Sequence, residues 1–166
     1  TLGDNLLFDA SSKGVYLGVT SETASNLLDD YEEGSFTPQY RGSAGSGTPT
    51  YTDQVGRYTK IGRVVHIQIR LVLSNKSTYS SGATVEIYGL PFSVTNVGAP
   101  PPASVELRQI NLPEHTAIAS FSDGNTFCHI KFLRDNENPT QCTHADLENN
   151  AVFIINGSYI HEERRK

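Results

Sequence analysis

A two-residue alternation of apolar and polar side chains between Val64 and Ser74 constrains the fold of this chain more than any other feature. Apolar residues occupy every second position of the segment, namely Val65, Ile67, Ile69, Leu71 and Leu73. Successive side chains on a β-strand point to opposite faces of a sheet, so the pattern predicts a strand with one face in a core. Its other face would meet water or a neighbouring subunit.

Further strand signals recur along the chain at short intervals. Residues Tyr51–Val65 indicate a strand, a glycine turn and a second strand. The other predicted strands are Thr84–Leu90, Ser104–Leu112, Ala117–Phe121, Thr126–Leu133 and Ala151–Ile160. The turn Ser122–Asn125 predicts a hairpin. A slip in the alternation of Ser104–Leu112 predicts a β-bulge, and Asn156-Gly157 predicts a bulge or kink in the last strand.

The connections between these strands are rich in Gly, Ser, Asn and Pro, the residues of turns. The tract Arg41–Pro49 is predicted to be flexible, and Arg134–Asn150 to be a long polar loop of the kind that binds ligands. About eight strands with turns at this spacing predict an all-β protein, with residues 35–166 forming a β-sandwich or jelly-roll-like domain.

Residues 1–34 are predicted to form a separate stem or neck segment. Two short apolar runs, Leu6–Asp9 and Val15–Val19, bury too little surface to fold alone and therefore need partners. A helical turn is expected around Glu22–Tyr31, capped by Ser21, within an acidic linker that ends at Gly34. Because the chain starts at Thr1 and contains no Met, we expect a piece of a longer protein.

The charge balance excludes some partners. The net charge of −5 disfavours nucleic acid, because an acidic surface repels the phosphate backbone. The basic end Arg164–Lys166 is interpreted as a solubilising tail. No apolar run is long enough to cross a membrane, and membrane insertion is not expected.

Residues suited to catalysis are present but not arranged in a recognisable motif. No Gly-x-Ser-x-Gly sequence occurs, so a serine nucleophile is not predicted. Cys142 and His144 could share one face of a strand, but the paired spacing of structural zinc sites is missing. We therefore expect no enzyme activity, no metal and no cofactor. Cys128 and Cys142 could pair, although free thiols are favoured for assembly in a reducing cytoplasm.

Four ordered motifs resemble the C-terminal head domains of bacteriophage tail fibres and related virion appendages. They are Leu28–Gly34 followed by Phe36-Thr37-Pro38, Tyr58–Val65, Gly89–Phe92 and Gly157–Tyr159. The resemblance spans residues 26–160 and is weakest over 100–150, where a variable tip is expected. It implies a homotrimer, joined to the rest of a virion fibre and assembled in the host cytoplasm.

The function implied by the resemblance is non-catalytic adsorption to a bacterial surface, through a polysaccharide or an outer-surface protein. Two alternatives stay open: a polysaccharide-degrading spike tip, and a purely structural fibre-joining or decoration domain. The trimer and neck residues would be Leu6, Leu7, Phe8, Val15, Leu17, Asp29, Asp30, Tyr31, Glu32 and Glu33. These acids would repel one another across a threefold axis unless they splay outward or are paired. Lys60 and Arg63 of another subunit could pair with them, and a solvated acidic linker is the alternative.

Carbohydrate recognition needs exposed aromatic rings and short polar side chains that bond sugar hydroxyls. Residues of this kind lie in the predicted loops or, for one of them, at the end of a predicted strand. The candidates for receptor binding are Tyr79, Phe121, Asp123, Asn125, Asn136, Asn138 and Gln141.

Overall fold

A computed structural model describes residues 13–23, 26–28, 30–95, 102–111 and 116–162 of the chain. Its strands are β1 (Val15–Tyr16), β2 (Leu27–Leu28), β3 (Tyr31–Phe36), β4 (Gln39–Gly42), β5 (Thr50–Ile61), β6 (Val64–Asn75), β7 (Val85–Tyr88), β8 (Pro102–Ile110), β9 (Thr116–Phe121), β10 (Phe127–Arg134), β11 (Glu137–Gln141) and β12 (Leu147–Ile160). The described residues contain no α-helix; their helical turns are of the 3₁₀ type, at Asn26 and in η2 (His144–Asp146). The all-β prediction is confirmed.

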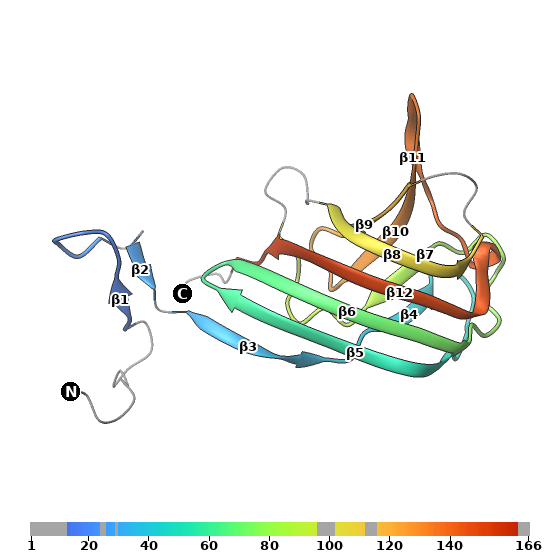
Figure 1. Cartoon of the computed structure of the whole chain (residues 1–166), viewed down its shortest axis with the longest axis horizontal. Coiled ribbons are helices and arrows are strands. Elements are labelled where there is room, and N and C mark those ends of the chain that lie inside the picture. Colours follow the sequence, from blue (N-terminus) through green and yellow to red (C-terminus); the bar gives the residue numbers. More distant parts are fainter. Residues whose placement is uncertain (1–12, 24–25, 29, 96–101, 112–115, 163–166) are drawn as a thin grey trace.

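Ten of these strands form one continuous antiparallel sheet, and β1 pairs with β2 in a separate two-stranded sheet. The order in the large sheet is β3-β5-β6-β12-β8-β9-β10-β7-β4, with β11 paired to β10. Figure 1 shows the sheet curling back on itself, so that the layer from β3 to β8 faces the layer from β9 to β4. The curl begins at β8 and β9, which pair only from Pro102 to Ser104. The expected sandwich is therefore one curled sheet.

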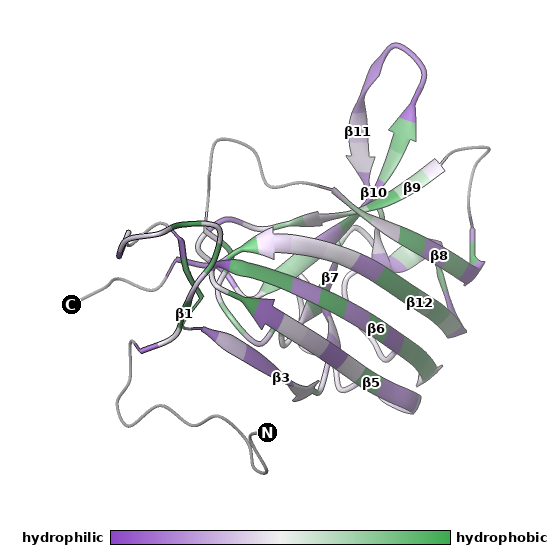
Figure 2. Cartoon of the chain, turned by 60° about the vertical axis from the view of Figure 1, so that its left-hand side comes forward, coloured by the Kyte–Doolittle hydropathy of each residue, from purple (hydrophilic) through white to green (hydrophobic). Residues whose placement is uncertain are grey.

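The apolar faces of both layers meet in a single core. Along β6 every predicted inward side chain from Val65 to Leu73 is buried, while His66, Gln68 and Arg70 are exposed. Figure 2 shows this alternation as bands of contrasting hydropathy along β5, β6 and β12. The opposite layer adds Ile87, Ile130 and their neighbours to the same cluster.

The two free edges of the curled sheet, β3 and β4, are joined by the short connection Thr37-Pro38. Side chains of β5 hold β4 across the gap. The backbone N–H of Tyr40 donates to the hydroxyl of Tyr51 over 3.1 Å, and the amide of Gln54 donates to the carbonyl of Pro38 over 2.8 Å. These bonds satisfy backbone groups that have no strand partner there.

Most predicted strands are confirmed, and two local features are confirmed in whole or in part. The turn Ser122–Asn125 joins β9 and β10, and Gly124 adopts φ +70° within it. A register irregularity in the β8–β12 pair lies opposite Arg108 and Ile110, with Gln109 at φ +56° between them. The slip in the sequence pattern predicts an irregularity at this place, but the additional residues lie on β12, between Leu147 and Val152, and not on β8.

Three local predictions differ from the structure in whole or in part. Within the helical turn expected around Glu22–Tyr31, Asn26 has a 3₁₀ conformation and donates its N–H to the carbonyl of Thr23 over 2.9 Å, but pairing with β1 and β5 makes β2 and β3 extended. Arg41 and Gly42 of the tract Arg41–Pro49 belong to β4, and the flexibility of the rest stays a prediction. The β6–β12 pairing runs through Asn156 and Gly157 without a bulge. Gly157 serves close packing instead, since a Cβ atom there would lie 2.4 Å from that of Ala103.

The acidic element is part of the large sheet as well as a link to the N-terminal strands. Strand β3 pairs with β5 from Tyr31 to Phe36, and Gly62 donates its N–H to the carbonyl of Asp30. The amine of Lys60, which is 1% exposed, pairs with the Asp30 carboxylate and lies 5.5 Å from the centre of the Phe92 ring. Lys60 therefore pairs within its own chain, and so does Arg63, whose partner is Glu162. Pairing of these two residues with acids of another subunit stays a prediction.

The division at residue 34 stays a prediction, and Leu6, Leu7, Phe8 and Asp29 lie outside the described residues. Of the other predicted neck residues, Val15 lies in β1, Leu17 follows it, and both are exposed. Tyr31, Glu32 and Glu33 lie in β3.

Replacing Gly157 by Ala should destabilise the fold, because the added methyl group overlaps Ala103. Overpacking of a filled core costs about 1–3 kcal/mol, and urea unfolding followed by circular dichroism would measure it. Gly82→Ala is the matched control, since a Cβ atom at Gly82 meets nothing within 4 Å. The double variant with Ala103→Gly should recover most of the loss. Equal stability of the Gly157 and Gly82 variants would contradict this packing.

Candidate functional site

The structure places the predicted receptor-binding residues in separate regions. Tyr79 lies in the β6–β7 connection, Asp123 and Asn125 lie in the β9–β10 turn, and the residues Asn136, Asn138 and Gln141 belong to the β10–β11 hairpin. Phe121 is 3% exposed and packs against Tyr159 in the core, which corrects its expected exposure. A receptor-binding role for the other six stays a prediction.

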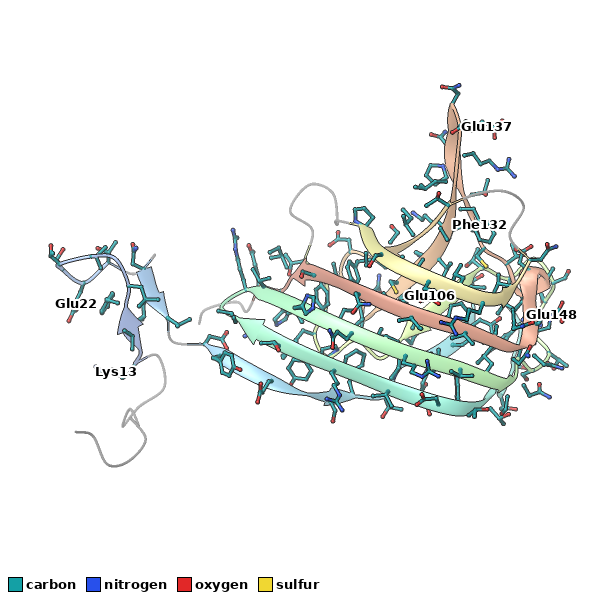
Figure 3. All side chains as sticks on the ribbon, in the orientation of Figure 1. Lys13, Glu22, Glu106, Phe132, Glu137 and Glu148 are labelled. Atoms are coloured by element: carbon teal, nitrogen blue, oxygen red, sulfur yellow. The ribbon has the colours of Figure 1, made fainter. Side chains whose placement is uncertain are left out.

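The connections β4–β5, β6–β7 and β11–β12 gather at the end of the sheet that lies opposite β1 and β2. Figure 3 shows Glu148 at this end, Lys13 and Glu22 at the other, and Glu137 at the tip of the projecting β10–β11 hairpin. Hydrogen bonds tie the gathered connections together. Thr48 donates its N–H to Ser77 Oγ over 2.8 Å, and Lys76 donates its N–H to Asn149 Oδ1 over 3.3 Å. We call this end the loop end.

A cleft of about 490 Å³ opens at the loop end between β4, the start of β5 and the glycine-rich β4–β5 connection. Tyr40, Tyr51 and Tyr79 line it, together with Gln39 and Arg41. The Tyr79 ring supports the connection, because Cβ atoms built at Gly42 and Gly47 would lie 2.7 and 2.8 Å from it. Its hydroxyl donates to the carbonyl of Gly47 over 3.1 Å. Glycine is therefore required for this part of the chain to follow the ring so closely.

A buried tyrosine–histidine pair underlies the cleft. The Tyr40 hydroxyl and His144 Nδ1 are 2.7 Å apart, and their rings are parallel within 5°. Burial raises the pKa of Tyr40, while burial and the nearby Lys76 lower the pKa of His144. Both groups are therefore neutral near pH 7, and Tyr40 can donate to an unprotonated Nδ1. The pair stabilises the cleft wall and leaves no ionised nucleophile.

A second hollow lies on the outer face of the β3-β5-β6 layer. This outer groove encloses about 530 Å³ and is lined by Glu33, Ser35, Arg57, Thr59, His66 and Gln68, among others. Its lining comes from cross-strand pairs: Ser35 faces Arg57, and Arg57 faces Gln68. The same row continues through Asn156 of β12 to Ser104 of β8. Because the row stands on paired strands, its positions are held more rigidly than those of a loop.

Neither hollow contains an obvious catalytic centre. Within the described ranges, no group of three or more His, Cys, Asp or Glu side chains could hold a metal ion. Cys128 and Cys142 are both buried and free, and burial raises each thiol pKa to about 12. The thiolate is the nucleophilic form, so neither cysteine is activated. The described part of the chain also has no helix long and apolar enough to span a bilayer.

Comparison with known proteins gives a structural likeness without a sequence family. No protein-family model matches the chain, and no curated protein matches it either. Among solved structures, part of the Dettilon tailspike protein matches with a TM-score of 0.62 at 18% sequence identity. The match covers 78% of this chain and 24% of the tailspike, so the chain spans about a quarter of that protein's length. The chain therefore shares its fold with a part of a tailspike.

Both thiols should be unreactive towards Ellman's reagent in the native protein at pH 8, because each is buried and protonated. Unfolding in guanidinium chloride should release two reactive thiols per chain, as measured by absorbance of the released thiolate. Fewer than two after unfolding without reductant would show that the cysteines pair or are already modified.

Proposed function

We propose that this chain is a head domain of a virion appendage that attaches a bacteriophage to a bacterial surface without catalysis. The fold likeness to part of a tailspike is the observation that carries the proposal. It agrees with the ordered motifs that resemble tail-fibre heads, of which Tyr58–Val65 forms the β5–β6 hairpin. Under this proposal the chain belongs to the virion.

The distribution of exposed side chains supports an attached end and a host-facing end. Among the described residues, seven of the eight exposed large apolar side chains lie in or next to β1 and β2 or at the adjoining ends of β3, β5 and β6; they are Val15, Tyr16, Leu17, Leu28, Tyr31, Ile61 and Val64. The loop end and the projecting hairpin are polar by contrast, and the loop end includes the tyrosine-lined cleft. The apolar end would join the fibre, and the loop end would face the host.

The attached end is proposed to form a homotrimer. Strands β1 and β2 pair over only two residues each, which is too little for an isolated hairpin to be stable. Tyr31, Ile61 and Val64 lie in one cross-strand row on the outer face and are 61%, 50% and 44% exposed. Contact between copies would bury this row and the apolar side chains of β1 and β2.

Fluorescently labelled protein should bind cells of a susceptible bacterial host and reduce adsorption of the phage that carries it. The measurement is cell-bound fluorescence across a panel of strains, together with free-phage counts. Strains resistant at the adsorption step provide the control and should bind little. Absence of binding to every phage-adsorbing strain would contradict the adhesive role and favour a structural domain. Release of reducing ends from host polysaccharide would favour the spike-tip alternative.

Val64→Asp should weaken the trimer, because it places a charge in the proposed apolar contact row. Val55→Asp is the matched control: Val55 is 42% exposed on the same outer face but lies outside the row. Light scattering across a dilution series should show a threefold monomer mass for the parent and the control. The Val64 variant should dissociate at a concentration about tenfold higher. Because the midpoint for a trimer varies as the square root of the dissociation constant, this corresponds to a loss of about 2.7 kcal/mol per trimer. A monomeric parent would contradict the trimer.

A further inference from the structure

We infer that the outer groove binds a saccharide that carries a carboxylate, and that Arg57 holds this carboxylate. The inference rests on the proposed adhesive function and adds a ligand class and a second contact surface, distinct from the loop-end cleft. Three features support it: the absence of an internal partner for Arg57 among the described residues, the polar row beside it, and the apolar residues on the side away from β1 and β2.

Arg57 differs from every other arginine that the structure describes. Arg63, Arg70, Arg108 and Arg134 each pair with a carboxylate, and Arg41 bonds Gln39 and lies over the Tyr88 ring. Arg57 has no hydrogen bond, ion pair or ring contact among the described residues. Its planar guanidinium matches a carboxylate through two parallel N–H···O bonds. The Arg57 guanidinium is therefore a cation without an internal partner in the described part of the groove, and it is well suited to bind an acidic group.

The polar row next to Arg57 suits the hydroxyl groups of a saccharide. Gln68, Asn156 and Ser104 continue it across β6, β12 and β8, and Ser35 precedes it on β3. Amide and hydroxyl side chains donate as well as accept hydrogen bonds, as sugar hydroxyls do. Adjacent strands lie about 4.8 Å apart, so the row offers regularly spaced contacts to an extended chain.

Apolar side chains border the polar rows on the side away from β1 and β2. There, Val55 of β5 and Ile154 of β12 share a row with Arg70. A saccharide ring has polar edges and apolar C–H faces, and this alternation of side chains would contact both.

The surrounding charge limits how acidic the ligand can be. The chain carries a net charge of −5, so a polyanion gains no general attraction. Glu33 also lines the groove, and its Oε2 accepts a hydrogen bond from the Tyr31 hydroxyl over 3.0 Å. A second carboxylate close to Glu33 would be repelled. The groove therefore favours a repeating unit with one carboxylate among neutral sugars over a uniformly charged polymer.

The test uses the full chain on an array of bacterial capsular and O-antigen polysaccharides that includes uronic- and sialic-acid members. Each acidic member is printed twice, once native and once with its carboxyl groups reduced to alcohols. The parent should bind native acidic members and bind their reduced forms about tenfold or more weakly, as expected from the loss of a charged hydrogen-bonded pair. Titration calorimetry with oligosaccharides of the best member would then give the dissociation constants.

Arg57→Gln should lose about tenfold or more in affinity, and Arg57→Lys should recover part of it because the charge returns without the bidentate geometry. Arg108→Gln is the matched control: Arg108 lies on the same outer face but pairs with Glu106, and its loss should leave affinity unchanged. Circular dichroism and light scattering would confirm that all three variants fold and assemble like the parent.

Three outcomes would overturn the inference: no acidic polysaccharide binds, the reduced forms bind equally well, or Arg57→Gln binds like the parent. Dissociation of the oligomer in Arg57→Gln alone would also overturn it, because Arg57 would then pair with another copy of the chain. The adhesive function is tested by a separate outcome, the adsorption of the parent to host cells. If the parent still adsorbs to host cells while the array is negative, only this inference is lost; if it adsorbs to none, the adhesive function is lost.

Discussion

Burial of one face along an unbroken antiparallel sheet is the constraint on which the rest of this structure depends. The strands of the two layers contribute inward side chains to a single core, and the sheet must curl for both layers to share it. Curling brings the edges β3 and β4 close together without pairing them. Side chains of Tyr51 and Gln54 then bond the backbone at Tyr40 and Pro38, which keeps the curl closed.

The same geometry separates the surfaces that the proposed function needs. Side chains that point outward do not pack in the core and can therefore be polar. On the outer face of β3, β5 and β6 they line a groove. Exposed apolar side chains lie at one end, next to β1 and β2, whereas the connections at the other end form a cleft around Tyr79. The ion pair between buried Lys60 and partly exposed Asp30 ties the acidic element to β5 at the apolar end.

Prediction from sequence succeeded where the signal was local and periodic. The strand at β6, the hairpin around Gly124 and the irregularity at Gln109 all follow from patterns within a few residues. It failed where distant pairing decided the outcome. The acidic element lacks alternation, and only its pairing with β5 makes it a strand. Turn-forming residues follow Phe121 in the sequence, and the side chain was therefore expected to be exposed. In the structure it packs in the core against Tyr159.

The amino-acid sequence by itself determined most of the strands and the face that each one buries. The reason is that the two-residue alternation of apolar and polar side chains can be recognised within a short stretch of consecutive residues. Only the tertiary structure decided which strands are neighbours and in which register. That register places Ser35, Arg57, Gln68 and Asn156 in one row, although they come from four distant segments. The same register brings Asp30 next to Lys60, with which it forms an ion pair. Arg57, by contrast, has no hydrogen-bond or ion-pair partner among the described residues. Cross-strand neighbours depend on how the whole sheet packs, and this packing cannot be deduced from any single stretch of the sequence.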